Sequence, residues 1–270
     1  MALTVMVGER NKAQNRFFII VFALLFIGCL TATIIGCAQM SAMEGMTMAG
    51  GWNMSMMWML MPGQTMLDGA IAFLGMWVVM MAVMMLPVLL PMLWCYRQGV
   101  GKVSSTRIDL LTVMVSIGYF VVWLLAGLAI FPLGIWLATL AMHYETLANA
   151  VPMVTAIIVM LAGFLQFTSW KAHQLSCCRS TYDDDFNSAN IFTALYYGLR
   201  IGLRCNYCCA GLTAVLLVIG VMNLLAMALI AIAIMAERIL PSAETTARLI
   251  GVVLVGVGFC FLIQATGMFN

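Results

Sequence analysis

The sequence predicts an all-α, polytopic membrane protein, a bundle of about six transmembrane helices with both termini in the cytoplasm. Of its 270 residues, 64% are hydrophobic and only 8% are charged, and the mean hydropathy is +1.08. A soluble globular domain carries about a quarter charged residues, so that class is excluded. α-Helices are the expected element because they satisfy their own backbone hydrogen bonds where no water is available.

Six apolar runs account for the predicted spans. A helix needs about 20 apolar residues to cross the hydrocarbon core, and longer runs are expected to tilt. In chain order, the runs cover residues 17–38, 67–94, 109–131, 150–170, 208–236 and 249–268. The first run is too long for a cleaved signal peptide and is expected to be retained. The sequence shows no internal repeat, which predicts one integral membrane domain over residues 1–270.

The basic residues predict which side each connection faces. Lysine and arginine collect on the cytoplasmic side, which places residues 95–108 and the cysteine-rich connection 171–207 inside. Residues 39–66 and 237–248 then face outside, with a short external turn near 142–149. The basic residues expected inside are Arg10, Lys12, Arg16, Arg97, Lys102, Arg107, Lys171, Arg179, Arg200 and Arg204, and those expected outside are Arg238 and Arg248.

The external segment 39–66 is rich in methionine. Met43 and Met46 are separated by two residues, and Met46 and Met48 by one, among glycine, serine and threonine. Thioethers are soft ligands that favour Cu(I), and they cannot form disulfides in an oxidising compartment. The segment therefore predicts capture of copper or another soft metal, and a bland, oxidation-tolerant hydrophobic plug is the alternative.

Three cysteines stand close together at the start of the fifth run. If a helix begins there, Cys205, Cys208 and Cys209 lie on one face at positions i, i+3 and i+4. Nearby arginines and the exposed amides of a helix N-terminus would favour thiolates, which bind soft metals tightly. The alternatives are a local disulfide, palmitoylation, or burial as small hydrophobic residues.

A second group of donors precedes this cluster. Cys177 and Cys178 follow His173 by four and five residues. A lone histidine is usually a satisfied surface group, but the neighbouring cysteines make His173 a candidate ligand beside them. His143 is a much weaker candidate.

Methionines also form a stripe in the second run. Met76, Met80 and Met84 recur at every fourth position, between the external methionine segment and the cytoplasmic cysteines. Such a stripe usually reflects helix packing, but a row of weak, exchangeable sites is also what passage of Cu(I) would need. Met80 and Met84 are therefore candidate metal residues.

Three stretches resemble a bacterial family of predicted metal-binding integral membrane proteins, domain of unknown function 2182. They are "LQFTSWKAHQLSCCRS", "GLRIGLRCNYCCAGL" and "GVMNLLAMALIAIAIMAERILP". The resemblance covers most of residues 70–260 and implies a metal-binding protein of the bacterial inner (cytoplasmic) membrane. The residues that fit the family pattern are Gln166, Thr168, Lys171, Cys178, Arg179, Cys205, Cys208, Cys209, Met222, Asn223, Glu237 and Pro241.

The chain departs from that family pattern at two positions. Gln174 stands where the resemblance implies a cysteine, and Ile201 stands where it implies a histidine. Cys177 and His173 offer two donors close by, so they are candidate substitutes. The alternative is that this member has lost a site that its relatives keep.

These features lead to two hypotheses of different classes. The first is a copper chaperone, delivery or transport protein that handles Cu(I), with a copper donor or acceptor protein as partner. The second is an accessory subunit of a larger membrane complex, such as a copper-dependent monooxygenase or oxidase. A third hypothesis, an enzyme that uses the thiols for redox chemistry, is less expected, because the Cys-x-x-Cys spacing stands at a helix start without a thioredoxin-like pattern. The sequence also has no nucleotide-binding loop or nucleophile elbow. It also has no basic patch for nucleic acid.

Overall fold

The computed structural model describes most of the chain. It covers residues 2–42, 46–47, 52–54, 58, 65–100, 104–179, 190–221, 223–240 and 242–266. Within these ranges, the side chains of 2–15, 40–42, 46–47, 53–54, 105 and 176–179 lie outside the description.

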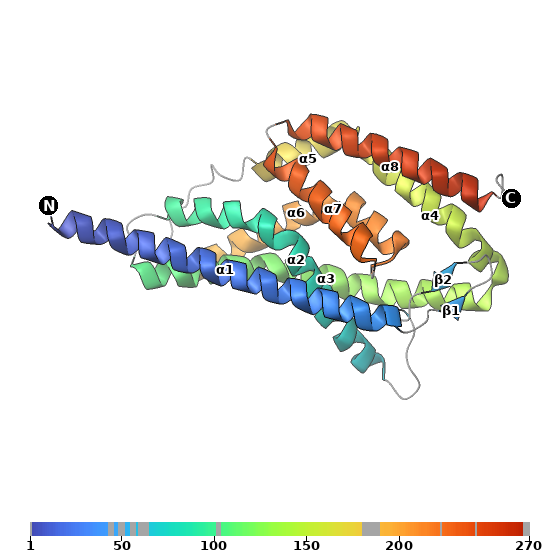
Figure 1. The fold of residues 1–270 in the computed structure, drawn as a ribbon, viewed down its shortest axis with the longest axis horizontal. Coiled ribbons are helices and arrows are strands. Elements are labelled where there is room, and N and C mark those ends of the chain that lie inside the picture. Colours follow the sequence, from blue (N-terminus) through green and yellow to red (C-terminus); the bar gives the residue numbers. More distant parts are fainter. Residues whose placement is uncertain are drawn as a thin grey trace.

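The described part of the chain is a bundle of helices (Figure 1). The helices are α1 (Ala2–Ala42), α2 (Met66–Gly99), α3 (Ser105–His143), α4 (Glu145–Leu165), α5 (Ser169–Arg179), α6 (Ile191–Ile219), α7 (Leu224–Ile239) and α8 (Ala243–Ala265). A short antiparallel pair, β1 (Met46–Thr47) with β2 (Asn53–Met54), lies between α1 and α2. Six helices in the described ranges, all except α5 and α7, are long and apolar enough to cross a membrane. This confirms the predicted all-α bundle and its number of spans.

The fifth predicted span is placed differently in the structure. The run 208–236 is not one helix, because α6 ends at Ile219 and Gly220 adopts a φ of 121°. That backbone conformation is readily open only to glycine. Asn223 then caps α7, its side chain accepting a hydrogen bond from the Ala226 amide. The spanning helix is instead α6, which begins well before Cys205, and Asn223 is a helix cap rather than an interhelical hydrogen-bond partner.

Side-chain contacts fix the direction of the first three helices. At one end of the bundle, Arg97 of α2 lies over the Phe18 ring of α1 and pairs with Asp109 of α3. Further along, the Trp77 indole of α2 donates to the Trp123 carbonyl of α3. Gly36 of α1 also lies against Met76 of α2, so α1 and α3 are both antiparallel to α2.

Close contacts also fix the directions of the later helices. Gly198 of α6 faces Val115 of α3, and Gly202 faces Tyr119, so α6 runs parallel to α3. Gly258 of α8 packs on Met160 of α4 and Gly251 packs on Gly163, so α8 runs antiparallel to α4. Helix α7 returns along the bundle between α6 and α8 (Figure 1).

The return of α7 changes the predicted arrangement of the chain ends. Lys171 of α5 forms an ion pair with Glu237 at the end of α7, so residues 237–248 start at the same end of the bundle as Arg97 and Lys171. We call this the basic end. The expectation that 237–248 lies opposite 171–207 was wrong, because it assumed one continuous helix over 208–236. The N- and C-termini consequently lie at opposite ends of the bundle (Figure 1), whereas the sequence predicted both on one side.

Helix α2 lies at the centre of the bundle. In its most apolar 18-residue window, 61% of the residues are buried, against 6% in α1. The helix continues through Pro87 and Pro91. Its buried stripe begins with aromatic rings and continues with thioethers toward the basic end: Phe73, Trp77, Met80, Met81, Met84 and Met85.

Glycines allow α3 and α6 to pack closely. A Cβ at Gly198 would overlap the Val115 carbonyl oxygen, and one at Gly118 would overlap the Leu195 carbonyl oxygen. Because backbone atoms occupy this space, they cannot move aside as a flexible side chain would. The close packing places Tyr119 of α3 against α6, where the cysteines lie.

Substitution of Gly198 by alanine tests this packing. We expect Gly198→Ala to lower the free energy of unfolding by about 1–3 kcal/mol, the usual cost of overpacking. Thermal or denaturant unfolding of the purified protein in detergent measures the change. Gly256→Ala in α8 is the control, because its Cβ would meet nothing within 4 Å. Equal stability of the two variants would show that α3 and α6 do not pack as described.

Candidate metal centre

The cysteines of α6 lie in the interior of the bundle. Cys205 is the fifteenth residue of a 29-residue helix, so the expectation that a helix begins there was wrong. The apolar and basic stretch before it continues the helix toward Ile191. Cys205, Cys208 and Cys209 are all at most 2% exposed. Helix-terminal amides therefore do not act on these thiols, and other groups must set their chemistry.

Three sulfur atoms from two helices meet around Cys205. Its Sγ lies 3.9 Å from Met85 Sδ in α2 and 4.0 Å from Cys209 Sγ, one helical turn away. Three sulfurs around one ion at bond lengths of about 2.3 Å would be about 4.0 Å apart. The separations from Cys205 match that trigonal geometry. We call Met85, Cys205 and Cys209 the sulfur triad.

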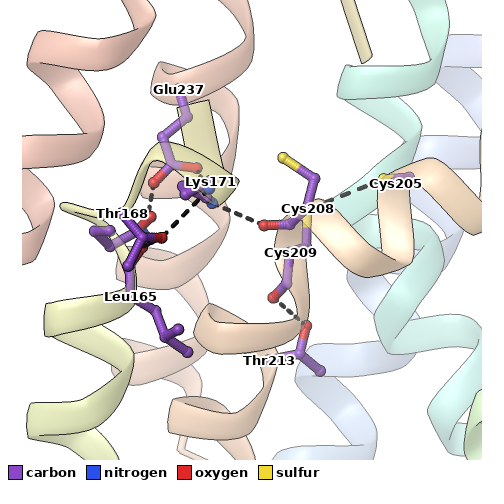
Figure 2. Close-up of polar contacts among 9 residues, drawn as sticks. Leu165, Thr168, Lys171, Cys205, Cys208, Cys209, Thr213 and Glu237 are labelled. Carbon is purple, nitrogen blue, oxygen red and sulfur yellow. Dashed lines mark hydrogen bonds and ion pairs between the residues drawn. The ribbon is translucent and has the colours of Figure 1, made fainter. Parts of the chain in front are cut away.

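Cys208 lies beside the triad and also beside Lys171, because its thiol interacts with Cys209 and with the Lys171 amine. Figure 2 shows its side chain between the Cys205 side of α6 and Lys171. Within the described residues, no three side chains among histidine, cysteine, aspartate and glutamate are placed to share a metal ion. The three cysteines of α6 are therefore not placed to share an ion by themselves, and the further sulfur that lies beside Cys205 is the Met85 thioether.

Two hydroxyl groups flank the triad. The Tyr119 hydroxyl in α3 donates to Cys205 Sγ at 3.0 Å, in a fully buried contact. The Thr213 hydroxyl donates to the Cys209 carbonyl oxygen at 3.0 Å (Figure 2). Tyr119 thus acts on a candidate ligand atom, whereas Thr213 acts on the helix backbone.

A buried polar group lies beside Cys208. The Lys171 amine contacts Glu237 Oε2 at 2.8 Å and donates to the Cys208 carbonyl oxygen at 2.7 Å (Figure 2). The Gln166 amide donates to Glu237 Oε1 at 2.8 Å. Burial opposes the charge of Lys171, but Cys208 and Glu237 nearby raise the pKa of its amine above the ordinary value. The pair joins α5, α6 and α7 next to the triad.

Of the other predicted ligands, some are buried in the bundle, one is exposed, and several have side chains outside the described part of the structure. Met80 and Met84 are buried in the α2 stripe, at 0% and 1% exposure. His173 is on the exposed surface of α5 and is not brought into the sulfur triad. The backbone of Cys177 and Cys178 lies in α5 and that of Met46 in β1, but their side chains are not described. Met43 and Met48 lie outside the described residues.

Sequence reasoning missed Tyr119 and did not connect Met85 to the cysteines. Tyr119 stands 86 residues before Cys205, and Met85 stands 120 residues before it. The one sequence signal for Tyr119 is a polar hydroxyl in an otherwise apolar run, where such groups usually find an interhelical partner. Gln166, Lys171 and Glu237 carried a better signal, because all three fit the family pattern and the structure brings them together.

Helices long enough to cross a membrane, enclosing a buried cluster of sulfur donors, define a candidate membrane protein for a soft metal. Residues 74–261 match the model of the family PpoB2, described as a copper chaperone. The chain therefore belongs to this copper chaperone family. The match spans every residue of the sulfur triad and its flanking groups. It confirms the copper-related part of the first hypothesis, under a family name that differs from the one the sequence suggested. No curated protein and no solved structure matches the chain.

Proposed function

We propose that the protein binds Cu(I) at the sulfur triad and passes it on as a copper chaperone embedded in a membrane. The observation that carries this proposal is the approach of Met85 and Cys209 to within 4.0 Å of Cys205 in the buried interior. Membership of a copper chaperone family supports copper as the metal.

The donor set explains the preference for the reduced ion. Thiolate and thioether sulfur are soft ligands that select Cu(I) over hard ions such as Mg²⁺ and Ca²⁺. Cu(I) with two cysteine thiolates and a neutral thioether forms a complex with a net charge of −1. Binding also requires both thiols to lose their protons, so we expect affinity to rise with pH.

The α2 stripe offers a route to the triad. Trp58 packs on Phe73 at the far end of the stripe, with ring centroids 5.4 Å apart. From Phe73, the buried thioethers of Met80 and Met84 lead toward Met85, and residues four apart on a helix lie about 6 Å apart along its axis. We propose that this row carries Cu(I) from the methionine-rich segment 39–66 to Cys205 and Cys209.

The charge distribution supports an orientation in the membrane. Arg97 near the end of α2 and Arg107 near the start of α3 lie at the basic end, which makes this end the cytoplasmic one by the positive-inside rule. The N-terminus then lies in the cytoplasm, and the methionine-rich segment and the C-terminus lie outside. A bacterial cytoplasmic membrane fits this proposal, with a soluble copper-binding protein as donor or acceptor.

Metal analysis of the purified full-length protein tests the proposed function. We expect one Cu(I) per chain after anaerobic loading, retained during competition with a chromogenic Cu(I) chelator. Elemental mass spectrometry and the charge-transfer absorption of copper bound to thiolate would measure this. If the reduced, folded protein retains no soft metal, the proposal fails. The alternative role as a structural subunit of a larger enzyme would then be the better hypothesis.

Replacement of Met85 by leucine tests whether the thioether binds the metal or only fills space in the core. We expect Met85→Leu to weaken Cu(I) binding by about tenfold or more, by analogy with the 10- to 100-fold cost of lesser changes around metal sites. Stability should change by less than about 1.5 kcal/mol, because the side-chain volume is kept. Chelator competition measures the affinity. Met92→Leu, on the same helix toward the basic end, is the matched control, and equal affinity of both variants would exclude Met85 as a ligand.

A further inference from the structure

The hydrogen bond from Tyr119 distinguishes Cys205 from the other sulfurs of the triad. Its hydroxyl donates to Cys205 Sγ at 3.0 Å. The same sulfur atom is the one that lies within 4.0 Å of both Met85 and Cys209. Tyr119 therefore contacts the sulfur that joins the triad together.

The packing of α3 against α6 holds this donor in place. Tyr119 is 1% exposed, and its ring packs edge-on against Phe120 at a centroid distance of 5.3 Å. On the α6 side, a Cβ at Gly202 would come within 2.9 Å of the Tyr119 carbonyl oxygen, so the two backbones are close at this point. The hydroxyl cannot turn toward water, and Cys205 is its hydrogen-bond acceptor.

We propose that Tyr119 is a positioning residue that sets the oxidation state of the bound metal, favouring Cu(I) over Cu(II) through its hydrogen bond to Cys205. This inference rests on the proposed copper site. It adds a residue that does not itself touch the ion and a property, the reduction potential, that the sulfur triad alone does not fix.

The physical reason is competition for sulfur electron density. A hydrogen bond to a coordinated thiolate withdraws charge from the sulfur, and hydrogen bonding around a cysteine ligand is known to tune copper potentials. Cu(II) needs more donation from its ligands than Cu(I), so the donor destabilises the oxidised state more. The reduction potential of the site therefore rises when Tyr119 donates.

This preference protects the thiols as well as the cargo. Oxidation of the site removes one electron from Cu(I) and gives Cu(II), and a one-electron oxidant such as ferricyanide takes up that electron. No protein bond breaks in this step. Each Cu(II) that forms can take one electron from one coordinated thiolate, which returns the ion to Cu(I) and leaves a thiyl radical. A raised potential therefore protects Cys205 and Cys209 by keeping Cu(II) from forming.

Tyr119→Phe tests the inference in the full-length protein in detergent. The Cu(I)-loaded variant is titrated anaerobically with ferricyanide, and the Cu(II) formed is measured by electron paramagnetic resonance. A hydrogen bond to a charged group is worth a factor of about ten or more. We expect the ratio of Cu(I) to Cu(II) affinity to fall about tenfold, which equals a fall of about 59 mV in potential.

Controls separate this effect from changes in folding or binding. Ag(I), a redox-inert monovalent ion, should still bind Tyr119→Phe at one per chain. Tyr96→Phe, which removes the hydroxyl of another buried tyrosine stacked on Tyr197, should leave the potential unchanged. If Tyr119→Phe fails to fold, 3-fluorotyrosine at position 119 replaces it. This more acidic phenol donates more strongly and should raise the potential.

The two proposals fail in different ways. If the unaltered protein binds neither Cu(I) nor Ag(I), the copper site itself is wrong. If it binds both, and neither Tyr119→Phe nor the fluorinated variant shifts the potential in the expected direction, the role of Tyr119 is overturned while the site stands.

Discussion

Cys205→Ser is expected to abolish stoichiometric Cu(I) binding. Loss of a partner outside the ligand shell costs about 10- to 100-fold in metal affinity, so loss of the central thiolate should cost at least about 100-fold. Serine keeps an acceptor for the Tyr119 hydroxyl and nearly fills the space, so the helix contacts around position 205 should persist. Competition with a chromogenic chelator, together with elemental analysis of the purified protein, measures the loss.

A matched control tests whether this loss is specific to the triad. Cys260 is exposed on α8, and Cys260→Ser should retain one Cu(I) per chain. The same spectra should show that thiolate-to-copper absorption disappears only in the Cys205 variant. Retention of full copper by Cys205→Ser would contradict the triad and would direct attention to the cysteines of α5 or to the methionine-rich segment.

The amino-acid sequence predicted the bundle because hydropathy and charge are local properties. Six apolar runs gave six helices of spanning length, and the stripe that begins at Met76 and includes Met80 and Met84 lies in the most buried of them. A central helix in a membrane bundle must be apolar around its circumference, and α2 has this character over most of its length.

The break after α6 could not be predicted in the same way. The residues around Gly220 are as apolar as a continuous span, and a hydropathy window does not register one glycine with a positive φ. The break that begins at Gly220 and ends with the Asn223 cap of α7 brings Glu237 back to Lys171. The error in the predicted side of residues 237–248 follows entirely from it.

The sequence predicted only those parts of the candidate site that lie on one helix and follow from helical spacing. Cys205 and Cys209 are one turn apart, so their proximity follows from the sequence alone. The third sulfur and the hydrogen-bond donor come from α2 and α3, and only tertiary packing decides which thioether and which hydroxyl meet Cys205. The α2 stripe offers several buried methionines, and periodicity does not distinguish Met85 from its neighbours.

Lys171→Met is expected to cause the largest loss of stability. Both members of the Lys171–Glu237 pair are buried, with side chains 6% and 2% exposed. Removal of one member leaves Glu237 as an uncompensated buried charge, which typically costs about 3–5 kcal/mol. Unfolding in detergent should show a correspondingly lower midpoint. The double variant with Glu237→Gln should recover much of the loss, because it leaves no unpaired charge in the interior.

The second ion pair of the described chain provides the contrast. Arg97, whose side chain is 6% exposed, pairs with Asp109, whose side chain is 44% exposed. Water reaches this pair through Asp109, and Arg97 keeps the Thr112 hydroxyl and the Phe18 ring as partners, so Asp109→Asn should cost less than Lys171→Met. Both variants break an ion pair between helices, and the comparison asks whether the partner left behind has other contacts. An equal, small cost for Lys171→Met and Asp109→Asn would mean that water reaches Glu237. Water would then also reach the α6 backbone at Cys208, where Lys171 donates to the carbonyl oxygen.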